Sequence, residues 1–276
     1  MTASVTSRQG VRPRGRLLSF IRRHALSFYA AVALGYLFLP VAVVILFSFN
    51  DNRGRFNFTW NGLTLKHWAN AFEIPNLFDS LVTSLQIAFL SALVATILGT
   101  LIALALVRYS FRGRSTTNLL LFLPMATPEV VLGSSLLAFY LTLGVARGFW
   151  TVVVAHIMFN ISYVVVTVKA RLAGFDRDLE EAAMDLYANE WATFRKVTLP
   201  MIMPGVFAAF LLGFALSFDD FIITNFNSGQ TVTFPLFIWG AARVGVPPQV
   251  NVFGTAIFAV TVSIMFINLA LQRRQT

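Results

Sequence analysis

The sequence predicts an all-α integral membrane protein with six transmembrane helices. Hydrophobic residues make up 57% of the 276 residues, and only 12% of the residues are charged. Several uncharged stretches are long enough to cross the hydrocarbon core of a bilayer, which takes about 20 helical residues. Within these stretches apolar residues cover all sides of the helix, whereas the strands of a membrane β-barrel would alternate in polarity over about 10 residues.

The residue types present limit the chemistry that the chain can perform. The sequence has no cysteine, which excludes disulfides and thiolate metal sites, and its three histidines are scattered. We therefore expect this chain to bind neither a metal nor a cofactor.

Six apolar stretches define the predicted spans. They form a transmembrane domain over residues 28–271, between a basic tail at 1–27 and a short tail at 272–276. The third span contains Pro124 and Pro128, which can unwind a helix where it lines a cavity. The spans are predicted at 28–49, 80–107, 116–142, 149–169, 200–222 and 250–271.

The distribution of basic residues predicts the orientation of the chain. An even number of spans places both termini on one side of the membrane, and Lys and Arg accumulate in cytoplasmic loops. If both termini are cytoplasmic, most of the 21 basic residues lie on the cytoplasmic side. This bias explains the net charge of +9 without nucleic acid as a partner. The basic residues that remain outside are Arg53, Arg55, Lys66, Arg147 and Arg243.

The N-terminal region imitates a signal peptide. However, its apolar run from Ala25 to Phe49 exceeds the roughly 7–15 residues of a cleavable segment. We expect an uncleaved first span, preceded by a partly disordered segment with an interfacial helix near 16–23. The largest outside segment, 50–79, is rich in Trp and Phe. It favours an aromatic belt at the headgroup level, with an outer docking surface as the alternative.

A polar segment at 176–198 separates the fourth and fifth spans and is predicted to form two short cytoplasmic helices. The pair Asp178 and Glu181 has the spacing of a capping box, which predicts that the first helix starts at Asp178 with this residue as its cap. One face of this helix carries the four residues Leu179, Ala182, Ala183 and Leu186.

The second short helix is predicted to be capped by Asn189. Pro200 and Pro204 limit its continuation and mark the entry into the fifth span. An apolar face with charged edges favours a dock for a cytoplasmic partner, and a solvated loop or an internal brace is the alternative. The residues on one side of this second helix are Trp191, Phe194 and Val197.

A family resemblance of this segment rests on the residues Glu181, Ala182, Ala183, Asp185, Leu186, Ala188, Phe194, Val197, Thr198, Leu199, Pro200 and Pro204. With these residues the segment resembles the EAA loop of permease subunits of type I ABC importers. In that family the loop forms coupling helices that sit in a groove of the ATP-binding subunit, so the resemblance implies an ATPase-coupling role that also includes Trp191 and Tyr187. The family usually has glycine at the position of Tyr187, at a tight bend. Tyr187 implies either a less demanding backbone or an added contact of its ring.

The resemblance extends from about residue 28 to residue 271 and implies the type I ABC importer permease fold in a bacterial inner membrane. Three further stretches, 61–68, 76–86 and 123–131, resemble the outer loop, second span and third span of the family. The stretches that are most similar to the second permease subunit of spermidine/putrescine importers are 217–224, 234–236 and 244–251.

The resemblance implies a transmembrane subunit of an ATP-driven, binding-protein-dependent importer that translocates spermidine and putrescine by alternating access. The sequence has no phosphate-binding G-x-x-x-x-G-K-[ST] motif. ATP and Mg²⁺ are therefore expected on partner ATPase subunits, and the chain is not itself an enzyme. The implied partners are a second homologous permease subunit, a dimer of ATP-binding subunits, an extracytoplasmic substrate-binding protein and membrane lipid.

Three acidic residues, Glu129, Asp219 and Asp220, lie inside or at the ends of predicted spans. A carboxylate at the bilayer centre costs about 2.5–3.5 kcal/mol on insertion scales, so each should face a cavity, a partner or the interface. Asp219 lies about 28 Å from the start of its span, toward the outer mouth. Two readings are equally open: hydrated acids at a helix end, or attraction of a cationic substrate with cation–π contacts from Phe218 and Phe221.

Only one of two adjacent helical carboxylates can face a narrow pore squarely, and we favour Asp220. Glu129 is either beside carbonyls exposed by unwinding or a paired acid at a kink. His156 and Asn160 share one face of the fourth span and predict interhelical hydrogen bonds, with a substrate role as the alternative. Packing positions are predicted at Gly99, Gly133, Gly205 and Gly213.

Other functions remain open on the sequence alone. The same importer class could carry ferric ion, thiamine or an organophosphonate, because small differences in the pore lining change the cargo. An ion-coupled secondary transporter is less favoured, since it usually shows inverted repeats or buried coupling charges in several spans. A membrane enzyme is disfavoured further, because no His/acid or Ser/His cluster can be placed on one side of the bilayer.

Overall fold

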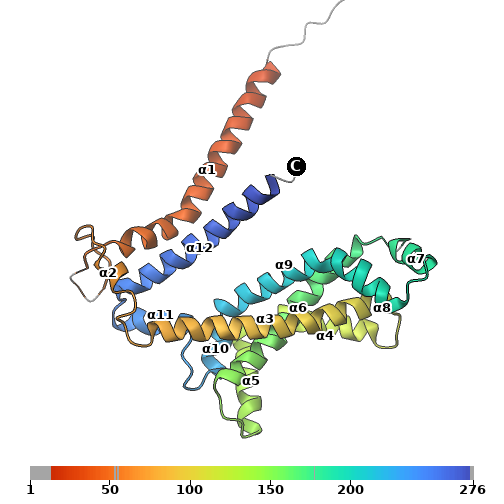
Figure 1. The fold of residues 1–276 in the computed structure, drawn as a ribbon. Coiled ribbons are helices and arrows are strands. Elements are labelled where there is room, and N and C mark those ends of the chain that lie inside the picture. The colour runs from red at the N-terminus through yellow and green to blue at the C-terminus, as the bar shows by residue number, and fades with distance from the viewer. Residues whose placement is uncertain (1–13, 53, 55, 177, 274–276) are drawn as a thin grey trace, which may run out of the picture. The chain divides into compact units, whose positions relative to one another are not determined.

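The computed structural model confirms an all-α membrane protein (Figure 1). Five of its described helices are long and apolar enough to cross a membrane, and a bent helix pair raises the number to six. Residues 1–13 and 274–276, which belong to the two predicted tails, lie outside the described part of the chain. The structure describes residues 14–52, 54, 56–176 and 178–273.

The described helices vary from single turns to long spans. They are α1 (Arg14–Ser48), α2 (Lys66–Ala69), α3 (Leu77–Arg108), α4 (Arg114–Ala126), α5 (Glu129–Thr142), α6 (Phe149–Ala173), α7 (Asp178–Asp185), α8 (Glu190–Thr193), the π-helix η1 (Phe194–Thr198), α9 (Leu199–Phe218), α10 (Ile222–Asn227), α11 (Phe234–Val244) and α12 (Pro248–Arg273).

The chain forms two compact units. The first contains α1, α2 and α12, and the second contains residues 74–245. Within the first unit α1 packs against α12, where Gly254 faces Val44. The predicted interfacial helix near 16–23 and the first span form one helix from Arg14 onward, so the prediction of a separate helix is wrong. The helix continues because residues 16–28 contain neither proline nor glycine.

Asn50 organises the loop that follows α1. Its Nδ2 donates to Oδ1 of Asn57 and to the carbonyl of Thr59, both at 2.7 Å, and its Oδ1 accepts from the backbone N–H of Asn61 at 2.7 Å. Trp68 stacks on Phe49 with 5.4 Å between ring centroids. These contacts fold the loop onto the end of α1 and satisfy a fully buried amide side chain.

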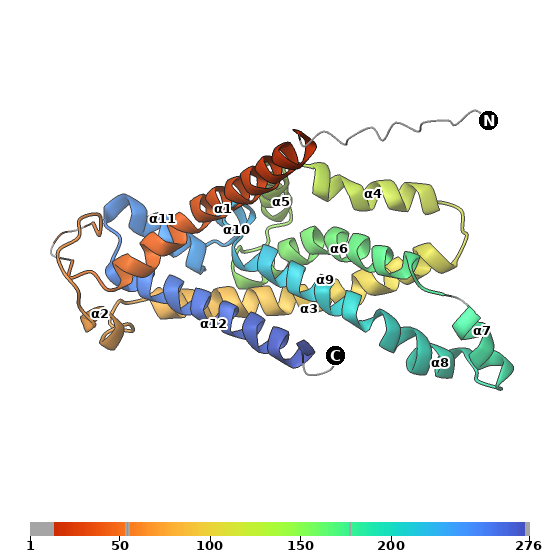
Figure 2. The same ribbon diagram turned by 90° about the horizontal axis from the view of Figure 1, so that it is seen from above.

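Three long helices, α3, α6 and α9, form the core of the second unit and lie side by side in both ribbon views (Figures 1 and 2). Small and β-branched side chains fill the space between them, which lets the backbones approach closely, as is usual between membrane helices. Fully buried residues of this core include Ala95, Ala103, Val164, Val168, Ile202 and Ala209.

Three of the four predicted packing glycines make close approaches. A Cβ atom at Gly99 would lie 2.6 Å from Val164 Cγ1, and one at Gly205 would lie 2.7 Å from Arg171 Cβ. A Cβ at Gly133 would lie 2.9 Å from a ring carbon of Phe226, which joins α5 to α10. At Gly213 the nearest atom would be at an ordinary contact distance of 3.6 Å.

The third predicted span is not one continuous helix. α4 ends at Ala126, α5 starts at Glu129, and the two helices meet at an angle of 106°. Thr127 adopts an extended backbone (ψ 132°) because it precedes Pro128, and proline disfavours the helical conformation at the residue before it. The predicted span at 116–142 is thus a bent pair of helices, and the predicted unwinding is confirmed at Pro128 but not at Pro124, which lies inside α4.

The fifth predicted span also differs at both ends. It begins earlier, because α8, η1 and α9 run as one continuous helix over Glu190–Phe218 in which Pro200 occupies the first turn of α9. The prediction that the two prolines stop the preceding short helix is therefore wrong. The helix ends at Phe218 instead of residue 222, since the carboxylate of Asp220 accepts the backbone N–H groups of Ile223 and Thr224 and starts α10.

We predict that Gly99→Ala lowers the free energy of unfolding by about 1–3 kcal/mol, because the added methyl group overpacks the contact between α3 and α6. Thermal unfolding of the subunit purified in detergent measures the change. The matched control is Gly240→Ala in α11, where an added Cβ meets nothing within 4 Å. Equal melting temperatures for the two variants would contradict the packing assignment.

Candidate functional site

Two short helices occupy the polar segment between α6 and α9, as predicted, but the start of the first differs. α7 includes Asp178 as its first residue, and Oδ1 of Asp176 accepts the backbone N–H of Asp178 at 3.1 Å. The prediction that Asp178 caps the helix is therefore wrong. Asn189 caps α8 as predicted, with its Oδ1 accepting the backbone N–H of Ala192 at 2.8 Å.

Tyr187 ends α7 in the left-handed backbone conformation, with φ of +64°. Its N–H donates to the carbonyl of Met184 at 2.9 Å, and the N–H of Ala188 donates to the carbonyl of Ala183 at 3.1 Å. This pair of bonds is the Schellman motif, whose left-handed position usually holds glycine. Tyr187 therefore keeps the tight bend, and the alternative of a less demanding backbone is wrong.

The bend presents large apolar side chains on the surface of this chain. Tyr187 is 100% exposed, Leu186 is 82% exposed and Trp191 is 68% exposed. Trp191 stacks on Phe194 with 5.7 Å between ring centroids. We call this surface the coupling face; it consists of Glu181, Ala182, Asp185, Leu186, Tyr187 and Trp191, all exposed.

The remaining predicted residues of this segment lie behind the coupling face or at its edge. Ala183, Ala188 and Leu199 are partly buried, and Pro200 is exposed. The surface thus combines the exposed apolar side chains of Leu186, Tyr187 and Trp191 with the acidic residues Glu181 and Asp185.

An aromatic cavity of about 530 Å³ lies at the other end of α9. Asp219 follows the last residue of α9, is exposed, and is the one acidic residue among those that line this almost entirely apolar cavity. Phe221 and Trp239 lie with their ring centroids 4.9 Å apart. The lining residues are Phe218, Asp219, Phe221, Phe234, Pro235, Ile238, Trp239 and Ala242.

The ring of Trp239 already contacts a positively charged side chain, that of Arg243. The guanidinium carbon of Arg243 lies 5.0 Å from the centroid of its ring, within the range of a cation–π interaction. α11, which carries both residues, is anchored to α3 by a hydrogen bond of 2.8 Å from the N–H of Phe234 to Oγ of Ser84. The cavity therefore combines aromatic walls that can accept positive charge with one acidic lining residue, Asp219.

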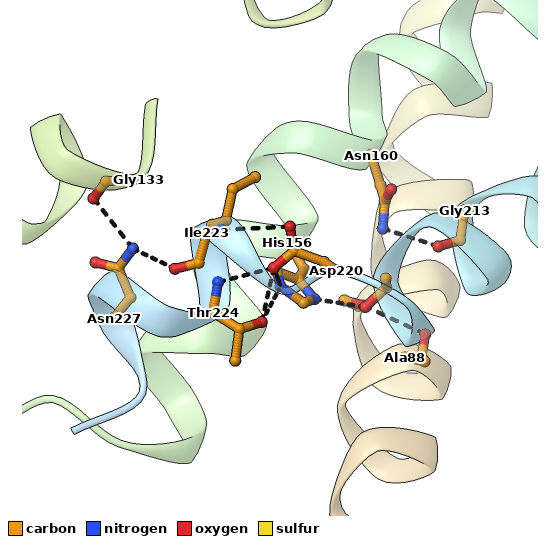
Figure 3. Close-up of polar contacts among 11 residues, drawn as sticks. Ala88, Gly133, His156, Asn160, Gly213, Asp220, Ile223, Thr224 and Asn227 are labelled. Atoms are coloured by element: carbon orange, nitrogen blue, oxygen red, sulfur yellow. Dashed lines mark hydrogen bonds and ion pairs between the residues drawn. The ribbon is translucent and has the colours of Figure 1, made fainter. Parts of the chain in front are cut away.

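Asp220 faces away from solvent and is engaged by neighbouring groups (Figure 3). Its side chain is 6% exposed, and Oδ2 lies 3.2 Å from Nε2 of His156 on α6. Oδ2 also accepts the backbone N–H and the hydroxyl of Thr224, each at 2.7 Å. These contacts satisfy a carboxylate in an apolar bundle, where an unpaired charge is costly.

A chain of polar contacts continues from His156 to α3. Nδ1 of His156 lies 2.5 Å from Oγ of Ser217, which lies 2.9 Å from Oγ of Ser91. Ser91 donates in turn to the carbonyl of Ala88 at 3.2 Å. This series of polar contacts links α3, α6, α9 and α10 (Figure 3).

The proton on Nε2 of His156 follows from its neighbours. Thr224 donates its hydroxyl proton to Asp220, so both oxygens near Nε2 can only accept, and Nε2 carries a proton. Ser217 lies between Nδ1 of His156 and Oγ of Ser91 and contacts both.

Glu129 and the two aspartates lie in one region. Glu129 is exposed in the first turn of α5, where a negative charge is favourable, and it is close enough to Asp219 and Asp220 for their charges to interact. Asn227 of α10 donates to the carbonyl of Gly133 on α5 at 3.2 Å. Unwinding at Pro128 thus brings the start of α5 to the end of α9.

The structure changes the relative roles that the sequence suggests for the two aspartates. Asp219 lines the aromatic cavity, whereas Asp220, which the sequence favours for the pore, is held by His156 and Thr224. The predicted interhelical hydrogen bonds of His156 and Asn160 are confirmed, since Asn160 Nδ2 donates to the carbonyl of Gly213 at 3.1 Å.

Trp239 was not identified from the sequence as a site residue. Its only signal is a short apolar stretch after Pro235 in a segment expected to be an outer loop. In the described part of the chain no group of three or more His, Asp or Glu residues could hold a metal ion.

Comparisons with known proteins show the family of this chain. Residues 95–276 match the family described as binding-protein-dependent transport system inner membrane component. The spermidine/putrescine transport system permease protein PotC of Haemophilus influenzae is 36% identical over 256 residues, which cover 92% of this chain and 98% of that protein. The putrescine transport system permease protein PotI of Escherichia coli K12 is 36% identical over 244 residues, covering 85% of this chain and 86% of that protein.

A solved structure shows the same fold. It is a bacterial ABC transporter involved in the import of the acidic polysaccharide alginate, and one of its chains matches with a TM-score of 0.67 and 16% sequence identity. The match covers 94% of this chain and 99% of that chain.

The unequal environments of the two aspartates predict unequal effects on stability. Asp220→Asn should lower the free energy of unfolding by about 1.5–3 kcal/mol, because it removes a buried carboxylate that accepts hydrogen bonds from Thr224 and contacts His156. Asp219→Asn should change it by about 0.5 kcal/mol or less, as is usual for exposed positions. Thermal unfolding of both purified variants in detergent compares them directly, and similar shifts would refute the assigned roles.

Proposed function

Because the chain belongs to the family of binding-protein-dependent transport system inner membrane components, we propose that it is the transmembrane subunit of an ATP-driven importer of spermidine and putrescine. The permease relatives named for these polyamines match over most of the chain, which supports this cargo. The observation that carries the proposal is the aromatic cavity whose lining includes the acidic residue Asp219.

A polyamine is a flexible chain of methylene groups with several ammonium groups. In the proposed binding mode one ammonium group pairs with Asp219, and a second lies against the ring of Trp239 or Phe221. The methylene groups lie against the remaining apolar walls of the cavity. Glu129 and Asp220 add negative potential nearby, which attracts a multiply charged cation without touching it.

Coupling to ATP is proposed to occur through the coupling face. An ATPase subunit docks on Leu186, Tyr187 and Trp191, and closure of the ATPase dimer after ATP binding displaces α7 and α8. The helices of the second unit then reorient, so that the cavity opens alternately to each side of the membrane. ATP and Mg²⁺ remain on the ATPase subunits, and this chain supplies the pathway and the docking surface.

The complete transporter is proposed to contain a second homologous permease subunit, two ATPase subunits and an extracytoplasmic binding protein. Both termini of this chain, the coupling face and residues 176–198 lie in the cytoplasm, and the aromatic cavity lies toward the outer side of the inner membrane. The distribution of Lys and Arg along the sequence supports this orientation.

We predict that Asp219→Asn lowers the uptake of labelled spermidine and putrescine about tenfold, the size expected for loss of a charge contact of about 1.4 kcal/mol. Trp239→Ala should lower uptake by a similar factor through loss of the cation–π surface. Uptake is measured in cells that lack other polyamine importers, with the partner subunits co-expressed.

The controls are Asp79→Asn and Trp150→Ala, which remove an exposed acid and an exposed tryptophan outside the cavity. Normal uptake by the Asp219→Asn variant would contradict the proposed role of the cavity in substrate binding. Absence of polyamine uptake by the unmodified transporter would contradict the proposal that polyamines are its substrates.

A second prediction concerns the coupling face. Glu181→Lys should abolish co-purification of the ATPase subunits with this chain, because it reverses a charge at the proposed interface. Glu73→Lys makes the same change in the other unit and should leave co-purification intact. Retention of the ATPase by Glu181→Lys to the level of this control would contradict docking on the coupling face.

A further inference from the structure

Glu180 is the residue of α7 that turns toward the rest of the second unit. Its side chain is 16% exposed, whereas its neighbours Leu179 and Glu181 are exposed. Oε1 of Glu180 accepts hydrogen bonds from the guanidinium of Arg108 and from the hydroxyl of Thr198. The same guanidinium nitrogen donates to Oγ of Thr198 at 3.1 Å. We call these three residues the base cluster.

The base cluster joins three helical elements. Arg108 is the last residue of α3, where a positive charge is stabilised by the helix dipole. Thr198 is fully buried and is the last residue of η1, directly before α9. Glu180 brings α7, which carries part of the coupling face, against both. π-helical turns occur frequently at functional sites, and here the turn positions Thr198 for its bond with Glu180.

A second polar contact ties the same long helices farther along. Ser91 of α3 lies 2.9 Å from Ser217 of α9, about 26 Å from Arg108 along its helix and about 28 Å from Thr198 along the other. α3 and α9 also pack against each other directly. Two helices that are fixed to each other at two separated points and packed together should move as one rigid element.

We propose that the base cluster is the joint through which a displacement of α7 reaches α3 and α9. Arg108 and Glu180 are then positioning residues for transport, and they contact neither ATP nor cargo. The proposal rests on the function proposed above, because it requires an ATPase to move α7. The result of that motion is displacement of Asp219, which directly follows α9.

The partial exposure of the ion pair separates this role from a purely structural one. The side chains of Arg108 and Glu180 are 27% and 16% exposed, and a hollow of about 200 Å³ lies beside them. Solvent that reaches an ion pair reduces the contribution of that pair to stability. Breaking the pair should therefore leave the fold and the ATPase contact intact and should reduce the transport obtained for each ATP hydrolysed.

The experiment uses the complete transporter in proteoliposomes. Spermidine uptake and ATP hydrolysis are measured in the same vesicles for Arg108→Glu, for Glu180→Arg and for the two changes combined. Each single change should lower uptake per ATP hydrolysed by about tenfold, a usual size for coupling between sites. The combined change restores opposite charges at the two positions. It should therefore recover most of the uptake per ATP hydrolysed. The controls are Arg112→Glu and Asp178→Arg, which alter exposed charges outside the base cluster.

A second measurement does not depend on the cargo. Because the sequence has no cysteine, one can be introduced at Leu211, which is 48% exposed on α9, and spin-labelled. The ATP-induced change in the label's spectrum should be present in the parent and both controls, lost in each single variant and regained in the combined variant. One outcome separates the two proposals: the parent shows this spectral change, the single variants lose it, and no spermidine is transported. That outcome contradicts spermidine as the cargo and supports the base cluster as the joint.

Two results would contradict the proposal that the base cluster transmits motion from α7 to α3 and α9. In the first, the single variants match the controls in both the uptake ratio and the label spectrum. In the second, the single variants lose the ATPase subunits on purification and the combined change does not restore them. The cluster would then shape the docking surface and would not transmit motion.

Discussion

The need to satisfy one buried carboxylate, that of Asp220, determines the arrangement at the end of α9. Its bonds to the backbone and hydroxyl of Thr224 end one helix and begin the next, and its contact with His156 fixes α6 against both. In an apolar bundle an unpaired charge would be costly, so these elements have little freedom to separate. The bonds of Asp220 also leave the neighbouring Asp219 free to line the aromatic cavity.

This division between two adjacent acids supports a polyamine over two of the other cargoes considered, ferric ion and an organophosphonate. A ferric ion is usually bound by several oxygen or nitrogen ligands, but Asp219 is surrounded in the cavity lining by aromatic and aliphatic side chains. An organophosphonate is an anion and would be repelled by Asp219 and by the nearby Glu129 and Asp220. An elongated cation with apolar spacers matches a single carboxylate beside aromatic rings.

The sequence was sufficient for features that depend on composition and local spacing. Long apolar runs gave the spans, and the cap at Asn189 followed from its position before α8. It was insufficient where partners distant in the sequence decide the outcome. The pairing of Asp220 with His156 across 64 residues gives no periodic signal, and Pro128 indicated a break without indicating a bend of 106°. For Tyr187 the sequence left two alternatives open, because the bonds to the carbonyls of Met184 and Ala183 keep a bend that propensity alone would assign to glycine.

α9 links the two proposed functional regions through its own length. The base cluster adjoins its first residue, and Asp219 directly follows its last, about 30 Å away for a helix of 20 residues. A packed helix transmits displacement along its axis with little compression, because protein interiors are dense. Coupling between ATP hydrolysis and the cavity therefore needs no chain of side-chain rearrangements through the bundle. It needs a firm contact at the base, which Arg108, Glu180 and Thr198 provide, and a helix end whose carboxylate is free to change its surroundings.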